Sequence, residues 1–228
     1  MRYKNIKEAK FISRPNRFIA NVELDGKEQV CHVKNTGRCK ELLIEGCTVF
    51  LEESDNPKRK TRFDLVAALK GEKLINMDSQ APNQVFYEWA EKYFGKGARI
   101  KPETVYKNSR FDCYIESGSR RIFAEVKGVT LEADGVASFP DAPTLRGIKH
   151  IEELIDAKQN GFESYIFFVV QMKGVKYFTP NYKTHAQFGE ALKKAQKAGV
   201  EILCVDCIVT PDTLLIDDFV EVKLEEKE

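Results

Sequence analysis

The residues Asp112, Glu125 and Lys127 have the types and the spacing of a metal-dependent phosphodiesterase site. They lie within residues 109–131, SRFDCYIESGSRRIFAEVKGVTL, which read as two strands joined by a tight turn at SGSRR. Side chains alternate between the two faces of a strand, so Glu125 and Lys127 project on one face, and Asp112 lies opposite its apolar neighbours. The pattern predicts either a solvent-facing hairpin held by salt bridges or a face that binds a cation.

The oxygen atoms of this hairpin suit Mg²⁺ or Mn²⁺. We expect Asp112, Glu125 and the backbone carbonyl of Val126 to be the ligands. Such an ion lowers the pKa of water and stabilises the charge that develops when a phosphodiester is hydrolysed. Lys127 could orient or deprotonate that water, or neutralise the phosphate. A further carboxylate could complete the shell; Glu103 is favoured, and the alternatives are Glu88 or a purely surface role for either residue.

The elements around the hairpin predict an α/β domain over residues 81–228. An aromatic stripe at helical spacing in VFYEWAEKYFG precedes the hairpin, and a helix at PTLRGIKHIEELIDAKQNG follows it. The continuous apolar runs at 166–170 and 200–205 are typical of strands that are covered on both faces. A helix, two or three antiparallel strands, a helix and a buried strand give the order αβββαβ, which is that of the PD-(D/E)xK nuclease fold.

Residues 1–80 show short strand signals separated by turns. Alternation at 18–24 is followed by the turn Asp25-Gly26 and a returning strand, then by a short helical piece, CKELL, and three further strands. We predict an OB-like barrel of five strands, partly open, with one short helix. Barrels of this type often bind nucleic acid through one face and its loops; the alternative is a barrel that only packs against its neighbour.

Composition places the protein among globular proteins of the cytoplasm. No apolar run approaches the roughly 20 residues that span a bilayer, and the N-terminus lacks the apolar core of a secretory signal. The six cysteines are scattered, as expected in a reducing compartment, and a metal or redox role for CVDC is disfavoured. We therefore expect no membrane partner.

DNA is the expected partner, bound mainly through its phosphates. Residues 1–80 hold 16 basic and 12 acidic residues, and the acidity of the chain is concentrated after Pro211. Affinity should fall steeply with salt, and without a helix-turn-helix or zinc-finger pattern we expect little sequence specificity. The candidate contacts are basic residues of the barrel and of the hairpin region, although a merely solvated surface stays an alternative: Arg17, Arg38, Lys40, Lys58, Arg59, Lys60, Arg62, Arg110, Arg146 and Lys149.

Four other polar residues are of types that could do chemistry. His32, His150 and His185 lack a partnered Ser or Cys motif, so a structural or exposed position is expected for each. Gln171 ends the buried strand, at a place where some nucleases of this class carry a Gln or Lys beside the site.

Long segments of the chain resemble the sugar fermentation stimulation protein A (SfsA) family of bacteria and archaea. They include NTGRCKELL (35–43), FDLVAALKGEKLINMDSQAPN (63–83) and ASFPDAPTLRGIKHIEEL (137–154). The resemblance implies an N-terminal OB-like domain, a C-terminal PD-(D/E)xK-like domain, DNA binding of low sequence specificity and a regulatory role in sugar (maltose) metabolism. Two small departures are Cys39, where an apolar residue is usual, and Lys34, where Pro is common.

Two hypotheses about function follow. In the first, a DNA-binding protein carries an active metal-dependent nuclease domain. In the second, a DNA-binding regulator uses the nuclease fold only as a scaffold. RNA as the substrate is a more distant possibility.

Overall fold

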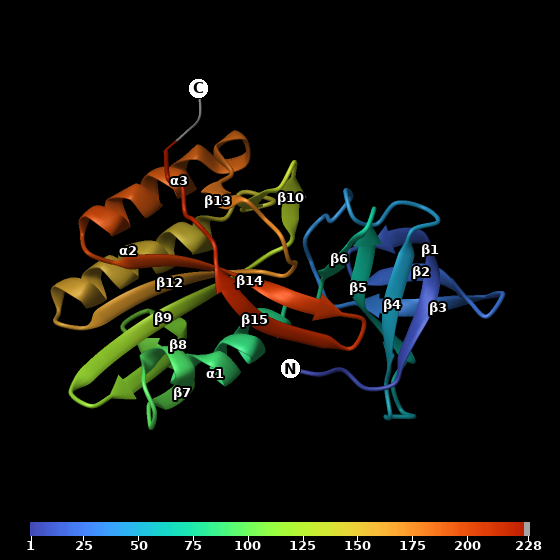
Figure 1. Cartoon of the computed structure of the whole chain (residues 1–228), viewed down its shortest axis with the longest axis horizontal. Helices are drawn as coiled ribbons and strands as arrows, with labels where there is room; N and C mark the ends of the chain where they lie inside the picture. Colours follow the sequence, from blue (N-terminus) through green and yellow to red (C-terminus); the bar gives the residue numbers. More distant parts are fainter. Residues whose placement is uncertain (226–228) are drawn as a thin grey trace.

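The computed structural model describes residues 1–225, which form a barrel beside a larger sheet covered by helices (Figure 1). The barrel strands pair in the order β3-β2-β1-β4-β5, and β3 pairs in parallel with β5 through Cys31–Phe63 to Val33–Leu65. That pairing closes the barrel. Its strands are β1 (Ile6–Asn16), β2 (Ile19–Leu24), β3 (Lys27–Val33), β4 (Thr48–Glu53) and β5 (Phe63–Lys70).

The predicted OB-like barrel is confirmed, with four differences in detail. It is closed rather than partly open, and the fifth predicted strand, β6 (Lys73–Asn76), is added to β5 outside the closed ring. The strand β1, which completes the ring, was not predicted, because Ala9 and Phe11 are its only fully buried residues. The helix predicted at CKELL is wrong: residues 39–42 form turns, and Cys39 has a left-handed backbone conformation (φ 46°).

The segment at residues 39–43 does not form a helix because its apolar side chains are needed inside the barrel. Cys39 and Leu42 are 2% and 1% exposed, and Leu43 is also buried in the same core. A compact turn directs all three side chains into this core, and the left-handed backbone conformation of Cys39 allows the chain to form it.

The second part of the chain confirms the predicted order αβββαβ. Its sheet has the order β15-β14-β12-β9-β8-β7, in which β9, β12 and β14 are parallel and the outer pairs are antiparallel. The elements are α1 (Ala81–Phe94), β7 (Arg99–Tyr106), β8 (Ser109–Ser117), β9 (Arg120–Val129), α2 (Leu145–Gln159), β12 (Glu163–Val170), α3 (Tyr182–Lys197), β14 (Glu201–Thr210) and β15 (Thr213–Phe219). A small sheet consists of β10 (Leu131–Ala133), β11 (Val136–Phe139) and β13 (Tyr177–Pro180).

Helices cover both faces of this sheet. Figure 1 shows α1 on one face and α2 with α3 on the other. The aromatic stripe of α1 is core, as predicted: Phe86, Ala90 and Phe94 are buried, and the Phe86 ring lies 4.8 Å from that of Phe167 on β12. Two covered faces explain why β12 is apolar along almost its whole length.

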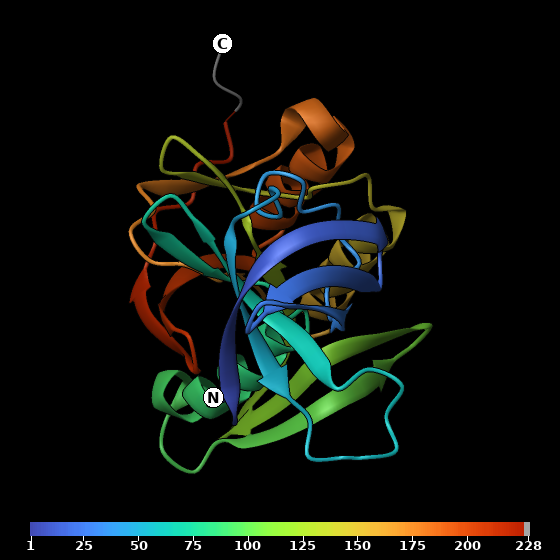
Figure 2. The same ribbon diagram turned by 90° about the vertical axis from the view of Figure 1, so that its right-hand side faces the viewer.

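Polar contacts join the barrel to the sheet domain. The amide of the buried Gln171 donates hydrogen bonds to Asn76 Oδ1 (2.8 Å) and to the carbonyl oxygen of Asp78 (2.9 Å). The first residues of the chain also lie against the sheet domain, where the ammonium of Met1 contacts Glu88 (2.7 Å). Figure 2 shows the barrel in front of the sheet domain from this side. Among residues 1–225, no helix combines the length and the apolar character needed to cross a membrane.

Candidate metal centre

The regular pairing of β8 with β9 ends one residue before Asp112 and Glu125. The predicted tight turn is present at Gly118-Ser119, with Gly118 at φ 60°. Residue pairs between the two strands run from Ser117–Arg120 to Cys113–Ala124 and include none beyond that point. Asp112 is the next residue on β8, so it stands where the regular ladder has ended.

Beyond the last paired residues, the side chain of Asp112 takes the place of a backbone acceptor for the neighbouring strand. Its Oδ2 accepts a hydrogen bond from the backbone N–H of Val126 (2.8 Å), and its Oδ1 accepts one from Asn83 Nδ2 (3.1 Å). Tyr87, one turn after Asn83 on α1, donates its hydroxyl to the carbonyl of Asp112 (2.8 Å). Because the N–H and C=O of one strand residue point to the same neighbouring strand, the Val126 carbonyl is directed to this place as well.

Glu125 is buried on β9, with one oxygen engaged and the other without a partner. Its Oε1 contacts Lys127 Nζ and His150 Nδ1, and its carboxylate is 3% exposed. The other nitrogen of His150 accepts a hydrogen bond from Arg146 Nε (3.4 Å), which assigns Nδ1 as the donor to Glu125. Glu125 Oε2 is buried and has no hydrogen-bond partner.

The electrostatics of the two carboxyl groups differ. Burial and the nearby charge of Glu125 raise the pKa of Asp112. Burial opposes ionisation of Glu125 too, yet the hydrogen bond from His150 and the charge of Lys127 hold the pKa of Glu125 below its usual value. One carboxylate is therefore charged in a buried position, and its charge disfavours ionisation of the other.

These residues fit a divalent cation. A buried carboxylate oxygen without a partner costs about 1–3 kcal/mol or more, so native structures rarely leave one unless an ion or a water satisfies it. Glu125 Oε2, Asp112 and the Val126 carbonyl are all hard oxygen donors, the kind preferred by Mg²⁺ and Mn²⁺. The arrangement can hold such an ion beside the ammonium group of Lys127.

Known proteins that resemble this chain agree on one family. The family model described as "Sugar fermentation stimulation protein RE domain" matches residues 80–213, and that described as "SfsA N-terminal OB domain" matches residues 12–77. The chain belongs to the SfsA family. A sugar fermentation stimulation protein homolog of Desulfitobacterium hafniense is 61% identical over 99% of this chain and 100% of its own length.

Other members of the SfsA family extend the comparison. The homolog of Clostridium beijerinckii is 57% identical over 98% of this chain and all of its own. A solved structure of SfsA from Pyrococcus furiosus, described as a complex with Ca²⁺, matches with a TM-score of 0.88 and 29% identity over 98% of each chain. The similarity therefore covers both parts of this SfsA-family chain.

The two glutamates predicted as a possible further ligand lie differently. Glu103 stands on β7 between residues paired with Cys113 and Phe111, across from Asp112, in a left-handed conformation (φ 50°). Its carboxylate is 64% exposed and forms an ion pair with Arg110 (3.4 Å). Glu88 is held by the Met1 ammonium, away from the hairpin. Among the described residues, neither carboxylate forms a group with Asp112 and Glu125 in which one oxygen of each lies within 4.8 Å of the others.

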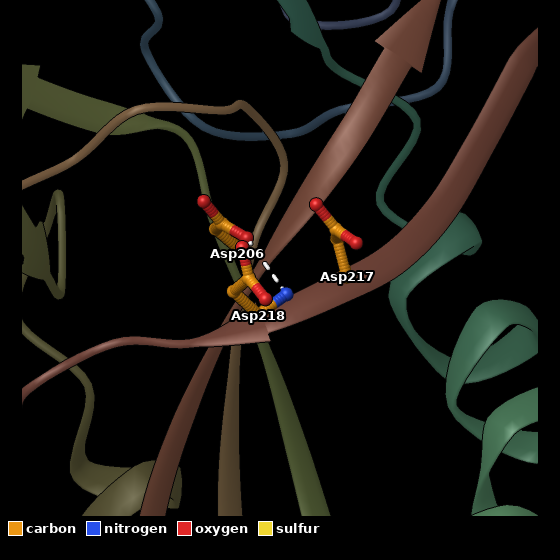
Figure 3. Close-up of side chains that lie close together, drawn as sticks. All are labelled: Asp206, Asp217 and Asp218. Atoms are coloured by element: carbon orange, nitrogen blue, oxygen red, sulfur yellow. Dashed lines mark hydrogen bonds between the residues drawn. The ribbon is translucent and has the colours of Figure 1, made fainter.

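A second group of carboxylates lies on β14 and β15. Asp206, Asp217 and Asp218 lie close together (Figure 3), and one oxygen of each lies within 4.8 Å of the others. Lys173 contacts all three, with Nζ at 3.0, 2.5 and 2.7 Å from Asp206, Asp217 and Asp218. The ammonium group thus occupies the place that a cation would take.

The predicted phosphate contacts fall into three regions. Arg17, Arg38 and Lys40 line one hollow on the barrel. The loop before β5 carries four more, of which Arg59 forms a two-pronged ion pair with Asp64 (2.8 and 2.6 Å) and Arg62 pairs with Glu53, while Lys58 and Lys60 are exposed.

The remaining three predicted contacts surround the hairpin. Arg110 pairs with Glu103, Arg146 is exposed and reaches His150, and Lys149 donates to the carbonyl of Asn108 (3.1 Å). Arg146 is therefore connected to Glu125 through His150.

Sequence reasoning missed the residues that hold the two carboxylates. His150, expected to be structural or exposed, is buried, and its contact with Glu125 was not predicted. Its place among the buried residues Gly147, Ile151 and Leu154 of α2 was the available signal. No sequence signal indicated that Asn83 or Tyr87 would face Asp112. Gln171 joins the two parts of the chain, and its side chain also lies against Gly128, the residue after Lys127.

Proposed function

We propose that this protein binds DNA with low sequence specificity and hydrolyses phosphodiesters at a Mg²⁺- or Mn²⁺-dependent site. The observation that carries the proposal is the buried Glu125 Oε2, which lacks a partner and belongs to the same hairpin as Asp112 and Lys127. We place this activity in the cytoplasm, in a protein whose family is named for sugar fermentation. The six cysteines, all free thiols, support a reducing compartment.

Each residue of the site has a distinct role in the proposal. Asp112, Glu125 and the Val126 carbonyl hold the ion, which supplies charge neutralisation and a lowered pKa for water. The Val126 N–H and Asn83 fix Asp112, and His150 fixes Glu125 with Oε2 left free. Lys127 brings a positive charge toward the scissile phosphate. The Pyrococcus furiosus SfsA structure, described as a complex with Ca²⁺, supports a divalent cation in a relative that covers the same length.

Phosphate contacts supply the affinity for DNA in this proposal. The exposed cations of the barrel and those around the hairpin would neutralise phosphates without reading bases, so binding should weaken steeply as salt rises. A positive patch of this kind is independent of the catalytic step, and the two can be tested separately.

A second candidate function is a DNA-binding regulator whose nuclease fold is catalytically silent. The observation that favours it is Glu103, the expected further ligand, whose carboxylate is exposed and paired with Arg110. With two carboxylates rather than three, the site could bind an ion that bridges a DNA phosphate without cutting.

Incubation with DNA separates the two candidates. Supercoiled plasmid and single-stranded DNA would be incubated with the purified protein in Mg²⁺, Mn²⁺ or EDTA, and wild type compared with Glu125→Gln. The proposal expects cleavage by wild type only with a divalent ion, and its loss in the variant while DNA binding persists. Cleavage by the variant at the wild-type rate would remove this site from consideration. Binding without cleavage of any substrate would favour the regulator.

A further inference from the structure

A hollow on the barrel collects four cationic side chains. Its volume is about 260 Å³, and Arg14, Arg17, Arg38 and Lys40 line it together with uncharged residues. No carboxylate belongs to this lining, as far as the described residues go. Three of the cations were expected to contact phosphate, but Arg14 carried no such expectation.

Arg14 is a rigid cation whose charge is not neutralised. Its Nη1 donates to the carbonyls of Gly37 (2.8 Å) and Arg38 (2.9 Å), and its Nη2 donates to those of Arg17 (2.8 Å) and Asn35 (2.6 Å). Its Nε is buried and has no hydrogen-bond partner. Four carbonyl dipoles fix the guanidinium in place without cancelling its positive charge, as a carboxylate would.

The other three cations also lack acidic partners. Within residues 1–225, no ion pair is formed by Arg17, Arg38 or Lys40, whereas Arg62 and Arg110 elsewhere are each paired with a glutamate. The carboxylate of Asp141 accepts a hydrogen bond from the backbone N–H of Arg38 (3.3 Å) but lines a neighbouring hollow instead. Four like charges around one concavity give a strongly positive potential that favours a compact anion.

The surroundings of the hollow indicate which anion it would take. Phe18 is 45% exposed, and the guanidinium of Arg17 lies 4.9 Å from the centre of its ring, so an aromatic surface adjoins the cations. Exposed aromatic rings beside basic grooves are where single-stranded nucleic acids stack their bases. The neighbouring hollow, of about 180 Å³, shares Thr36 and Gly37 with this one and extends to Gly128, the residue after Lys127.

We propose that this hollow binds the terminal phosphate monoester of a nucleic-acid strand, with the adjoining base against Phe18. A phosphate monoester carries a charge of about −1.5 to −2 at pH 7, compared with about −1 for a diester within the strand. Four cations around one open hollow match the more highly charged and compact group. This inference rests on the proposed function, because both take nucleic acid as the ligand. It adds that the protein prefers the end of a strand to its interior.

Binding to matched oligonucleotides tests the inference. Fluorescence anisotropy would be measured in EDTA with the full chain and three single-stranded DNAs of one sequence, labelled internally and carrying a 5′-phosphate, a 3′-phosphate or hydroxyls at both ends. We expect one of the two phosphorylated strands to bind about tenfold more tightly than the unphosphorylated one, the size of effect expected from a charge-assisted contact. The two phosphorylated strands show which end is bound.

Variants at the rim of the hollow complete the test. Arg38→Gln combined with Lys40→Gln should weaken all three strands, because both residues are proposed phosphate contacts, but the loss for the preferred phosphorylated strand should be about tenfold larger, so that the preference disappears. Phe18→Ala should weaken all three strands by roughly fivefold or more, through loss of stacking. The matched control, Lys194→Gln with Lys197→Gln, removes two exposed charges from α3 and should change nothing. Thermal unfolding checks that each variant is folded.

Equal affinity of wild type for the three strands would overturn the inference. An equal loss for all three in the Arg38 and Lys40 variant would overturn it too, because it would show contacts to internal phosphates. EDTA keeps this test apart from catalysis. A preference for phosphorylated ends without cleavage in Mg²⁺ would support phosphate binding in the hollow and contradict nuclease activity. Cleavage without the preference would support nuclease activity and contradict phosphate binding in the hollow.

Discussion

Two clusters of carboxylates in this protein each contain a lysine, but they differ in what the lysine leaves free. In the cluster of β14 and β15, Lys173 contacts Asp206, Asp217 and Asp218 together. In the hairpin cluster, Lys127 and His150 share a single oxygen of Glu125, and Oε2 keeps no partner. The first cluster contains more carboxylates, whereas the second contains a buried oxygen without a hydrogen-bond partner.

The difference lies in how the charge of each cluster is balanced. Hydrogen bonds to Asp217 and Asp218 raise the pKa of Lys173, so this ammonium stays charged and serves as the counter-ion of its cluster. At the hairpin, burial keeps water away from Glu125, and its neighbours are arranged on one side only. A cation would complete the second cluster, but it would have to displace Lys173 from the first.

The largest expected effect is on Mn²⁺ binding when one carboxylate is neutralised in each of the two clusters. Glu125→Gln should weaken Mn²⁺ binding by more than the 10- to 100-fold typical of residues that only support a ligand. Asp217→Asn is the matched control and should bind Mn²⁺ as wild type does, because Asp206 and Asp218 still neutralise Lys173. Isothermal titration calorimetry measures both. Weakened Mn²⁺ binding in Asp217→Asn with unchanged binding in Glu125→Gln would place the metal in the aspartate cluster of β14 and β15.

The next effect concerns the residue that holds Glu125. His150→Ala should reduce Mn²⁺ affinity about 10- to 100-fold, because Glu125 loses the hydrogen bond that leaves Oε2 free for the ion. His150→Gln, whose amide can donate to the same oxygen, should recover part of that loss. Calorimetric titration measures the Mn²⁺ affinity of both variants. Equal affinities for the two variants, both folded, would show that the hydrogen bond from residue 150 to Glu125 does not contribute to metal binding.

A smaller effect is expected when the lysine of the other cluster is removed. Lys173→Met leaves three aspartates without their counter-ion, and we expect the melting temperature to fall by roughly 2–4 °C, about 1 kcal/mol for a chain of this size. Ca²⁺ should raise the melting temperature of this variant more than that of wild type, because the vacated place suits a cation. Differential scanning calorimetry measures both shifts, and a variant as stable as wild type and indifferent to Ca²⁺ would refute this explanation.

The smallest effect concerns Asp64, a buried carboxylate that is as fully paired as the cluster of β14 and β15. Burial opposes its ionisation, but hydrogen bonds from Arg59 and the charge of Lys34 hold the pKa of Asp64 below its ordinary value. A lowered pKa in the folded state stabilises the fold above the ordinary value near 3.9, and that contribution is lost as pH falls through the lowered one.

Replacement by a neutral side chain tests this dependence. Asp64→Asn should therefore destabilise the protein by about 1–3 kcal/mol at pH 7 and by progressively less below pH 4. Urea unfolding across pH measures the trend. Asp25→Asn, at an exposed turn, serves as the control. A deficit in the Asp64 variant that stays constant from pH 7 to pH 3 would contradict the assignment.

Local sequence patterns predicted much of this architecture, and long-range contacts decided the rest. The hairpin with its Gly118-Ser119 turn and the order αβββαβ follow from alternation, turn residues and helical spacing. Closure of the barrel depends on the pairing of β3 with β5, strands that lie some thirty residues apart in the chain, and no local pattern encodes it. The same holds for the failed helix at residues 39–43, whose side chains were drawn into the barrel.

The candidate site divides in the same way. The types and spacing of Asp112, Glu125 and Lys127 could be read directly. The contact from Asp112 to the Val126 N–H depends on where the pairing of two strands ends, and the contact from Glu125 to His150 depends on how α2 crosses the sheet. Arg59 shows the same limit, since the sequence did not indicate that this predicted phosphate contact pairs with Asp64.

Crystals soaked in Mn²⁺ test the central claim most directly, because anomalous scattering locates the ion without assuming any activity. We predict an anomalous peak beside Glu125 and Asp112 and none among Asp206, Asp217 and Asp218. A peak in that aspartate cluster with none at Glu125 would contradict the account.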